Sequence, residues 1–180
     1  MCGRNSTVAR QPTRHTGMNY PLFKRTSIAC LFALLFTISM VSAADFSGSV
    51  VGILDGDTIE VLHNQHPERI RLSGIDCPEK SQAYGQKAKQ ATSALVFGKE
   101  VTLQTFGKDK YGRTIGNVLL SDGRMLNHEL VKDGWCWWYQ KYAPRNTTLE
   151  SLEGEAREAK RGLWADPYPV PPWEWRKRSK

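Results

Sequence analysis

Residues 47–62 read SGSVVGILDGDTIEVL and decide the prediction of the fold. Two mostly apolar stretches flank the polar bend Asp55-Gly56-Asp57. The second stretch alternates apolar and polar residues, a pattern typical of a half-buried β-strand. The sequence therefore predicts a β-hairpin that carries two carboxylates at its bend.

A second segment, RIRLSGIDCPE at residues 69–79, predicts a further strand that ends in an acidic loop. Alternation along the strand places Arg71 on the face opposite to Ile70, so the arginine points away from the core. The loop that follows contributes Asp76 and Glu79. Because this loop and the hairpin bend end neighbouring strands, we expect their carboxylates to converge.

The remaining chain adds two strands around a charged turn at residues 108–113 and several helices. Apolar residues recur at helical spacing over residues 81–97, and a shorter helix is expected to close at Gly134. A capping-box sequence at Thr147 opens a last helix, which we expect Gly162 to close. Five strands interrupted by one helix predict an α+β fold, a five-stranded Greek-key barrel of the OB type with about three helices.

The N-terminal residues 1–43 have the pattern of a secretory signal peptide. Lys24 and Arg25 precede an apolar run, and small residues up to Ala43 fit a peptidase cleavage site. Met18 is an alternative start that gives a signal of ordinary length. We therefore expect a secreted or periplasmic protein, without stable membrane association after cleavage.

The mature chain divides into an OB-fold domain at residues 44–166 and a tail at residues 167–180. We expect the tail, PYPVPPWEWRKRSK after Asp166, to be too rich in proline for a helix. Its basic end could hold a polyanion or form a disordered terminus.

The net charge of +7 is unevenly distributed. Residues 1–43 carry five basic and no acidic side chains, and residues 176–180 carry four more basic ones. Residues 44–175 are left with a net charge of −2. Contact with a nucleic acid must therefore depend on local placement of arginine and lysine, or on a metal ion at a carboxylate cluster.

Export leaves two cysteines, Cys77 and Cys136, in an oxidising compartment. They can form a disulfide, or they can remain two partly buried thiols. The sequence leaves both alternatives open.

The acidic loops and the arginines together predict a metal-assisted phosphodiester site. Carboxylates brought together favour a hard divalent cation such as calcium. Arg71 and Arg113 have the planar fork that matches a phosphate, and Glu79 could accept a proton from water. Taken singly, each acidic turn could reflect only the turn preference of Asp and Gly, and each arginine only a surface ion pair.

The three motifs D-G-D-T, R-x-x-x-x-D-x-P-E and D-K-Y-G-R, in this order, resemble the staphylococcal or micrococcal nucleases, also called thermonucleases. The resemblance covers residues 47–165. It implies an OB barrel with three helices and calcium-dependent hydrolysis of DNA and RNA that leaves 3′-phosphate ends. It also implies that Asp57, Asp76 and the backbone carbonyl of Cys77 bind the calcium ion, although the family has a threonine where Cys77 stands.

The resemblance further implies that Arg71 and Arg113 bind the phosphate and that Glu79 activates the water. It suggests Lys110, Tyr111 and Tyr142 as substrate-binding residues, of which Tyr142 aligns less cleanly.

Aromatic side chains in this region could stack on bases, but Trp135, Trp137 and Trp138 are equally explained by ordinary core packing. The alternative function is an OB-fold module that binds nucleic acid or protein without hydrolysis. A structural calcium-binding export protein is a third interpretation. We expect a monomer.

Overall fold

The computed structural model describes residues 45–178. The predicted signal peptide, residues 1–43, lies outside the described residues. Within the described part of the chain, no helix combines the length and apolarity that a membrane crossing needs.

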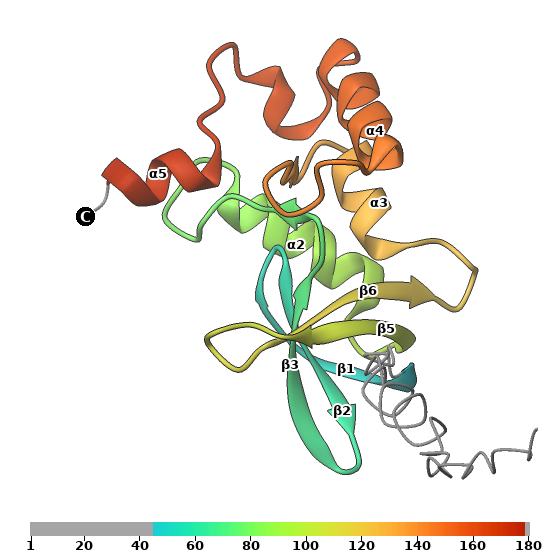
Figure 1. Cartoon of the computed structure of the whole chain (residues 1–180). Helices are drawn as coiled ribbons and strands as arrows, with labels where there is room; N and C mark the ends of the chain where they lie inside the picture. The colour runs from blue at the N-terminus through green and yellow to red at the C-terminus, as the bar shows by residue number, and fades with distance from the viewer. Residues whose placement is uncertain (1–44, 179–180) are drawn as a thin grey trace, which may run out of the picture. The chain divides into compact units, whose positions relative to one another are not determined.

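Five strands close into a barrel, and a separate two-stranded sheet lies beside it (Figure 1). All neighbouring strands of the barrel are antiparallel except β3 and β6, which are parallel. The predicted α+β fold with a five-stranded barrel is confirmed. The barrel order is β1 (Phe46–Asp55), β2 (Thr58–His63), β3 (His66–Leu72), β6 (Thr114–Leu120) and β5 (Glu100–Lys108), and the small sheet pairs β4 (Ile75–Asp76) with β7 (Trp137–Trp138).

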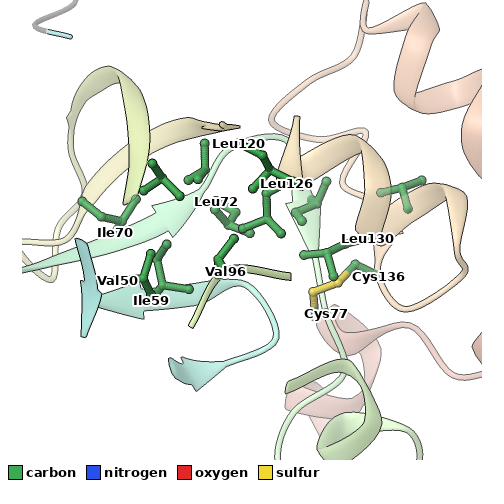
Figure 2. Packing of buried hydrophobic residues seen from close by; sticks show 14 of the residues in the cluster. Val50, Ile59, Ile70, Leu72, Cys77, Val96, Leu120, Leu126, Leu130 and Cys136 are labelled. Carbon is green, nitrogen blue, oxygen red and sulfur yellow. A yellow bond between two sulfur atoms is a disulfide. The ribbon is translucent and has the colours of Figure 1, made fainter. Parts of the chain in front are cut away.

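The barrel interior is filled by branched aliphatic side chains, which the alternation in the strands directs inward (Figure 2). Ile59 and Ile70 are fully buried, and they face each other in the β2–β3 register. Leu126 and Leu130 extend the same core from a helix. The burial of Ile70 and Leu72 confirms that Arg71 projects from the other face of β3.

The helices are gathered at one end of the barrel in Figure 1. The helix expected at residues 81–97 begins later than predicted, because Tyr84 adopts a left-handed conformation (φ 66°) just before it. The described residues contain α2 (Gly85–Val96), α3 (Leu126–Lys132), α4 (Thr147–Glu158), the short 3-10 helix η1 (Gly162–Ala165) and α5 (Pro172–Arg178).

Helix α4 forms where the sequence predicts it, but its ends differ. The side chain of Asn146 caps it by accepting a hydrogen bond from the backbone of Leu149, so the cap is one residue earlier than the predicted Thr147. The helix ends at Glu158, before the left-handed Lys160 (φ 51°). Gly162 therefore does not close α4; it begins η1.

The prediction that the tail is too rich in proline for a helix was wrong, because α5 forms at Pro172–Arg178. Pro172 stands at the start of the helix, where a missing backbone N–H breaks no intrahelical bond and the fixed φ suits the first turn. Trp173 packs edge-on against Trp137, which fixes the segment on the domain. The structure therefore has four α-helices in residues 45–178, instead of about three.

A disulfide joins Cys77, directly after β4, to Cys136, directly before β7 (Figure 2). Both cysteines are buried in the main core. The bond links the residue directly after Asp76 to the segment that follows α3.

We expect loss of this disulfide to lower the free energy of unfolding substantially. The bond closes a sequence separation of 59 residues. In the loop-entropy account, a loop of that size corresponds to about 4 kcal/mol. Urea unfolding of the mature protein and of the Cys77→Ser/Cys136→Ser variant measures the difference; a change below about 1 kcal/mol contradicts this prediction.

Candidate active site

The hairpin bend at Gly56 lies close to Cys77, directly after β4, and to Ala88 of α2. A Cβ atom added at Gly56 would lie 2.9 Å from the Cβ of Cys77 and 2.9 Å from that of Ala88. Glycine is therefore needed at the centre of the bend. The contact places Asp57 beside the loop that contains Asp76, although the two residues are far apart in the sequence.

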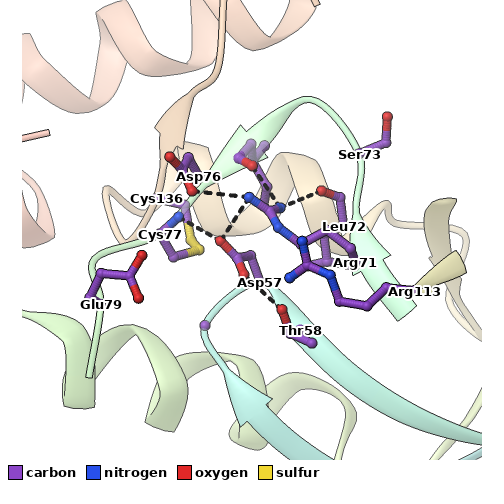
Figure 3. Close-up of polar contacts among 12 residues, drawn as sticks. Asp57, Thr58, Arg71, Leu72, Ser73, Asp76, Cys77, Glu79, Arg113 and Cys136 are labelled. Atoms are coloured by element: carbon purple, nitrogen blue, oxygen red, sulfur yellow. Dashed lines mark hydrogen bonds and ion pairs between the residues drawn. A yellow bond between two sulfur atoms is a disulfide. The ribbon is translucent and has the colours of Figure 1, made fainter. Parts of the chain in front are cut away.

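Arg71 brings the two aspartates together. Its Nη2 atom lies 3.2 Å from Oδ2 of Asp57 and 3.0 Å from Oδ1 of Asp76 (Figure 3). Its Nη1 atom donates to the backbone carbonyls of Leu72 and Ile75, at 2.7 and 2.8 Å. The convergence of carboxylates that the sequence predicts is therefore present, with a guanidinium between them.

Asp57 is held rigidly by its neighbours. Its Oδ1 accepts a hydrogen bond from the hydroxyl of Thr58 (3.0 Å), and its Oδ2 accepts one from the backbone N–H of Cys77 (2.9 Å). This contact places the backbone N–H of Cys77 beside Asp57. Asp57 is only 7% exposed.

Asp76 is 1% exposed and is the more deeply buried of the two. Burial raises the pKa of its carboxyl group, and the negative charge of Asp57 acts in the same direction. Hydrogen bonding to Arg176 and the charge of Arg71 oppose the rise. Two ionised carboxylates this close together repel each other, so a cation that contacts both of them stabilises the pair.

Glu79 lies at the open side of the cluster and is linked to Asp76 through Arg176. The Nη1 atom of Arg176 donates to Oε1 of Glu79 at 2.7 Å and to Oδ1 of Asp76 at 3.2 Å. Its Nη2 atom donates to Oδ2 of Asp76 at 2.6 Å. Three carboxylates thus share two guanidinium groups.

Arg113 lies directly before β6, which pairs with β3, the strand that carries Arg71. The parallel pairing of Ile70 with Thr114 brings the two strand segments side by side. The guanidinium of Arg113 is paired with Asp109: its Nε and Nη2 atoms each lie 2.7 Å from Oδ2 of Asp109. The structure therefore places Arg113 at the end of the turn that precedes β6, where its side chain pairs with Asp109 of the same turn.

The suggested substrate residues are on the surface. Tyr111 is 71% and Tyr142 is 70% exposed. The Nζ of Lys110 lies 4.9 Å from the centre of the Tyr111 ring, and Tyr142 packs edge-on against Tyr139. Cationic side chains lie over both rings, Lys110 and Arg113 over Tyr111 and Lys141 over Tyr142. Exposed rings beside cations are suited to contact a base and its phosphate.

The tryptophans of this region have a different role. Trp137 and Trp138 are 7% and 8% exposed and pack in the interior, whereas Trp135 is partly buried against the main core. The interpretation of these residues as ordinary core packing is confirmed.

The donor set suits a hard divalent cation. Asp57 and Asp76 offer carboxylate oxygens, and backbone carbonyls and water can complete the loose coordination that such ions accept. Within residues 45–178, no three His, Cys, Asp or Glu side chains cluster as a complete ligand set. A cation here would therefore depend on two carboxylates and on oxygens from the backbone or solvent.

The sequence reasoning did not identify Arg176, Thr58 and Asp109 as site residues. Thr58 is the last residue of the D-G-D-T motif and Asp109 the first of D-K-Y-G-R, but a motif does not show that each one hydrogen-bonds a predicted site residue. For Arg176 the sequence shows only a basic run directly after two tryptophans that flank Glu174, which does not by itself connect the tail with the site.

Comparison with known proteins assigns the family. The family described as "Staphylococcal nuclease homologue" matches residues 69–166. An "Uncharacterized endonuclease" of Escherichia coli O157:H7 is 47% identical over 147 residues, which cover 81% of this chain and 95% of that protein. The "Micrococcal nuclease" of Shigella flexneri is 41% identical over 157 residues, covering 82% and 90%.

A more distant relative, an "Uncharacterized endonuclease" of Haemophilus influenzae, is 38% identical over 161 residues, covering 88% of this chain and 89% of that protein. The chain belongs to the staphylococcal nuclease family. It is accordingly a nuclease, an enzyme that hydrolyses phosphodiester bonds.

Proposed function

We propose that the protein is a secreted or periplasmic, calcium-dependent nuclease that cleaves both DNA and RNA and leaves 3′-phosphate ends. The observation that carries this proposal is the convergence of Asp57 and Asp76 on Arg71. Glu79 is linked to the same cluster through the guanidinium of Arg176. A non-catalytic binding module has no need for this combination of buried carboxylates and arginines.

Asp57, Asp76 and the backbone carbonyl of Cys77 would hold the calcium ion. When bound, the ion supplies positive charge that offsets the growing charge on the phosphate and lowers the pKa of nearby water. The hydrogen bonds that fix Asp57, from Thr58 and from the backbone of Cys77, orient one carboxylate in advance. Such preorganisation lowers the cost of rearranging the ligands.

Glu79 would accept a proton from the attacking water. The water oxygen forms a bond to phosphorus, the bond from phosphorus to the 5′ oxygen breaks, and that oxygen takes a proton from solvent water and leaves as a 5′ hydroxyl. The phosphate stays on the 3′ side. Glu79 is partly exposed, so water can reach it.

Arg71 and Arg113 would stabilise the negative charge that grows on the phosphate oxygens as the fifth oxygen approaches. For Arg113 this requires exchange of its partner Asp109 for the phosphate. The exposed rings of Tyr111 and Tyr142, with Lys110, would bind neighbouring nucleotides by stacking and charge. The strength of such stacking depends little on the base sequence or on the sugar, which favours activity on both DNA and RNA.

Digestion of a single-stranded DNA and an RNA of the same sequence tests the proposal. We expect both to be cleaved in calcium, cleavage to stop with a calcium chelator, and activity to return when calcium is added in excess. Labelling the products with a kinase before and after phosphatase treatment identifies the ends. Equal rates with and without chelator would reject the role of the metal, and saturable binding without cleavage would favour the binding module.

A further inference from the structure

The C-terminal helix α5 places a basic side chain directly on the site. The guanidinium of Arg176 contacts both carboxylate oxygens of Asp76, at 3.2 and 2.6 Å, and Oε1 of Glu79, at 2.7 Å. Arg176 is separated from these residues by about a hundred positions in the sequence, and its contacts are not the result of local chain geometry.

The position of α5 is fixed by packing that does not involve this charge contact. Trp173 stacks on Tyr139, with ring centres 5.1 Å apart and planes at 2°. It also packs edge-on against Trp137, with ring centres 5.6 Å apart. The carbonyl of Val170, just before the helix, accepts a hydrogen bond from the side chain of Gln82. Aromatic packing therefore fixes the position of α5, and from this position the side chain of Arg176 reaches Asp76 and Glu79.

The contacts of Arg176 are to groups that the proposed function requires. Asp76 can serve a hard cation only through the same carboxylate oxygens that now accept from the guanidinium. Glu79 can accept a proton from water only if its oxygens are accessible to that water. A guanidinium and a divalent cation at one carboxylate also repel each other. Arg176 contacts both oxygens of Asp76, whereas Arg71 contacts only Oδ1. Binding of Arg176 and binding of a cation at Asp76 are therefore antagonistic.

We propose that Arg176 is an additional residue of the active site, which occupies the cation-binding carboxylate Asp76 in the metal-free protein and must leave it when calcium binds. The proposal rests on the proposed function, since it takes Asp76 as a calcium ligand. Its consequence is a lower apparent calcium affinity, because only the fraction of molecules with Arg176 withdrawn can bind the ion. The C-terminal tail thus sets the calcium concentration at which the enzyme becomes active.

The test compares the mature protein with its Arg176→Gln variant by calorimetric titration with calcium. Arg178→Gln is the matched control, because it removes the same charge from the same helix and its partner is the exposed Glu174. We expect Arg176→Gln to bind calcium about tenfold more tightly, equivalent to about 1.4 kcal/mol. We expect the control to stay within about twofold of the unsubstituted protein, since exposed pairs contribute little.

Stability supplies a second readout that a merely structural role would not produce. We expect Arg176→Gln to lower the urea midpoint of the calcium-free protein. In saturating calcium, where Arg176 has left Asp76, the two proteins should unfold at nearly the same urea concentration. A structural role for Arg176 predicts the same loss of stability with and without calcium.

Equal calcium affinity of the unsubstituted protein and Arg176→Gln overturns the inference but leaves the proposed function intact. An equal tightening in Arg178→Gln also overturns it, because the effect would then be one of general charge. Absence of calcium binding to all three proteins overturns the inference together with the calcium dependence of the proposed function.

Discussion

Replacement of Glu79 by Gln is expected to lower kcat by about a hundredfold or more, the contribution typical of a positioned general base. Glutamine keeps the shape and the hydrogen bonding of the side chain but cannot take the proton of the attacking water. Calcium affinity and affinity for single-stranded DNA should be largely kept. Single-turnover cleavage under saturating calcium measures the chemical step.

The control for this change is Glu150→Gln, which removes the same charge from the exposed surface of α4. It should leave kcat unchanged. If Glu79→Gln retained more than half of kcat, Glu79 would not be the base. If it lost calcium binding as well, Glu79 would act mainly through the metal.

The second large effect is expected for Arg113→Lys. Lysine keeps the positive charge but lacks the planar fork that donates two parallel hydrogen bonds to a phosphate. Loss of such donors in the transition state corresponds to about a hundredfold to a thousandfold in kcat. The free energy of unfolding should change by less than about 1 kcal/mol, because the ion pair of Arg113 with Asp109 is partly exposed.

Arg124→Lys is a matched control for Arg113→Lys. Arg124 also lies in a turn and also pairs with a nearby aspartate, Asp122, but the motifs of the site do not include it. It should retain full activity. Equal activity of both variants would show that a point charge at Arg113 suffices, and would remove the argument for a bidentate phosphate contact.

The barrel could be predicted from the sequence because strands such as β3 and β6 alternate buried and more exposed residues and turn residues separate the strands. In β3, burial of Ile70 and Leu72 follows directly from the alternation. The boundaries of helices were less predictable. The left-handed Tyr84 delays α2, and a non-glycine residue in that conformation is held by tertiary contacts, for which the local sequence gives no signal.

The central residues of the site were predictable because two acidic motifs end neighbouring strands, so that Asp57 and Asp76 meet at Arg71. The environment of Arg113 was not, since its pairing with Asp109 of the same turn depends on side-chain positions that the motif does not specify.

The prediction that the tail contains no helix was wrong because it treated every proline of the tail as incompatible with a helix. A proline obstructs a helix only from its interior, and Pro172 stands at the first turn. The docking of Trp173 on Tyr139 and Trp137 is a long-range contact. Arg176 could therefore be assigned to the site only once the position of α5 was known.

A crystal structure of the mature protein in saturating calcium would show directly whether Asp57 and Asp76 hold the ion. We expect a calcium ion within about 2.3–2.6 Å of carboxylate oxygens of both residues, with the guanidinium of Arg176 moved off Asp76. An ion bound elsewhere, or both carboxylates paired only with arginines at saturating calcium, would contradict this expectation.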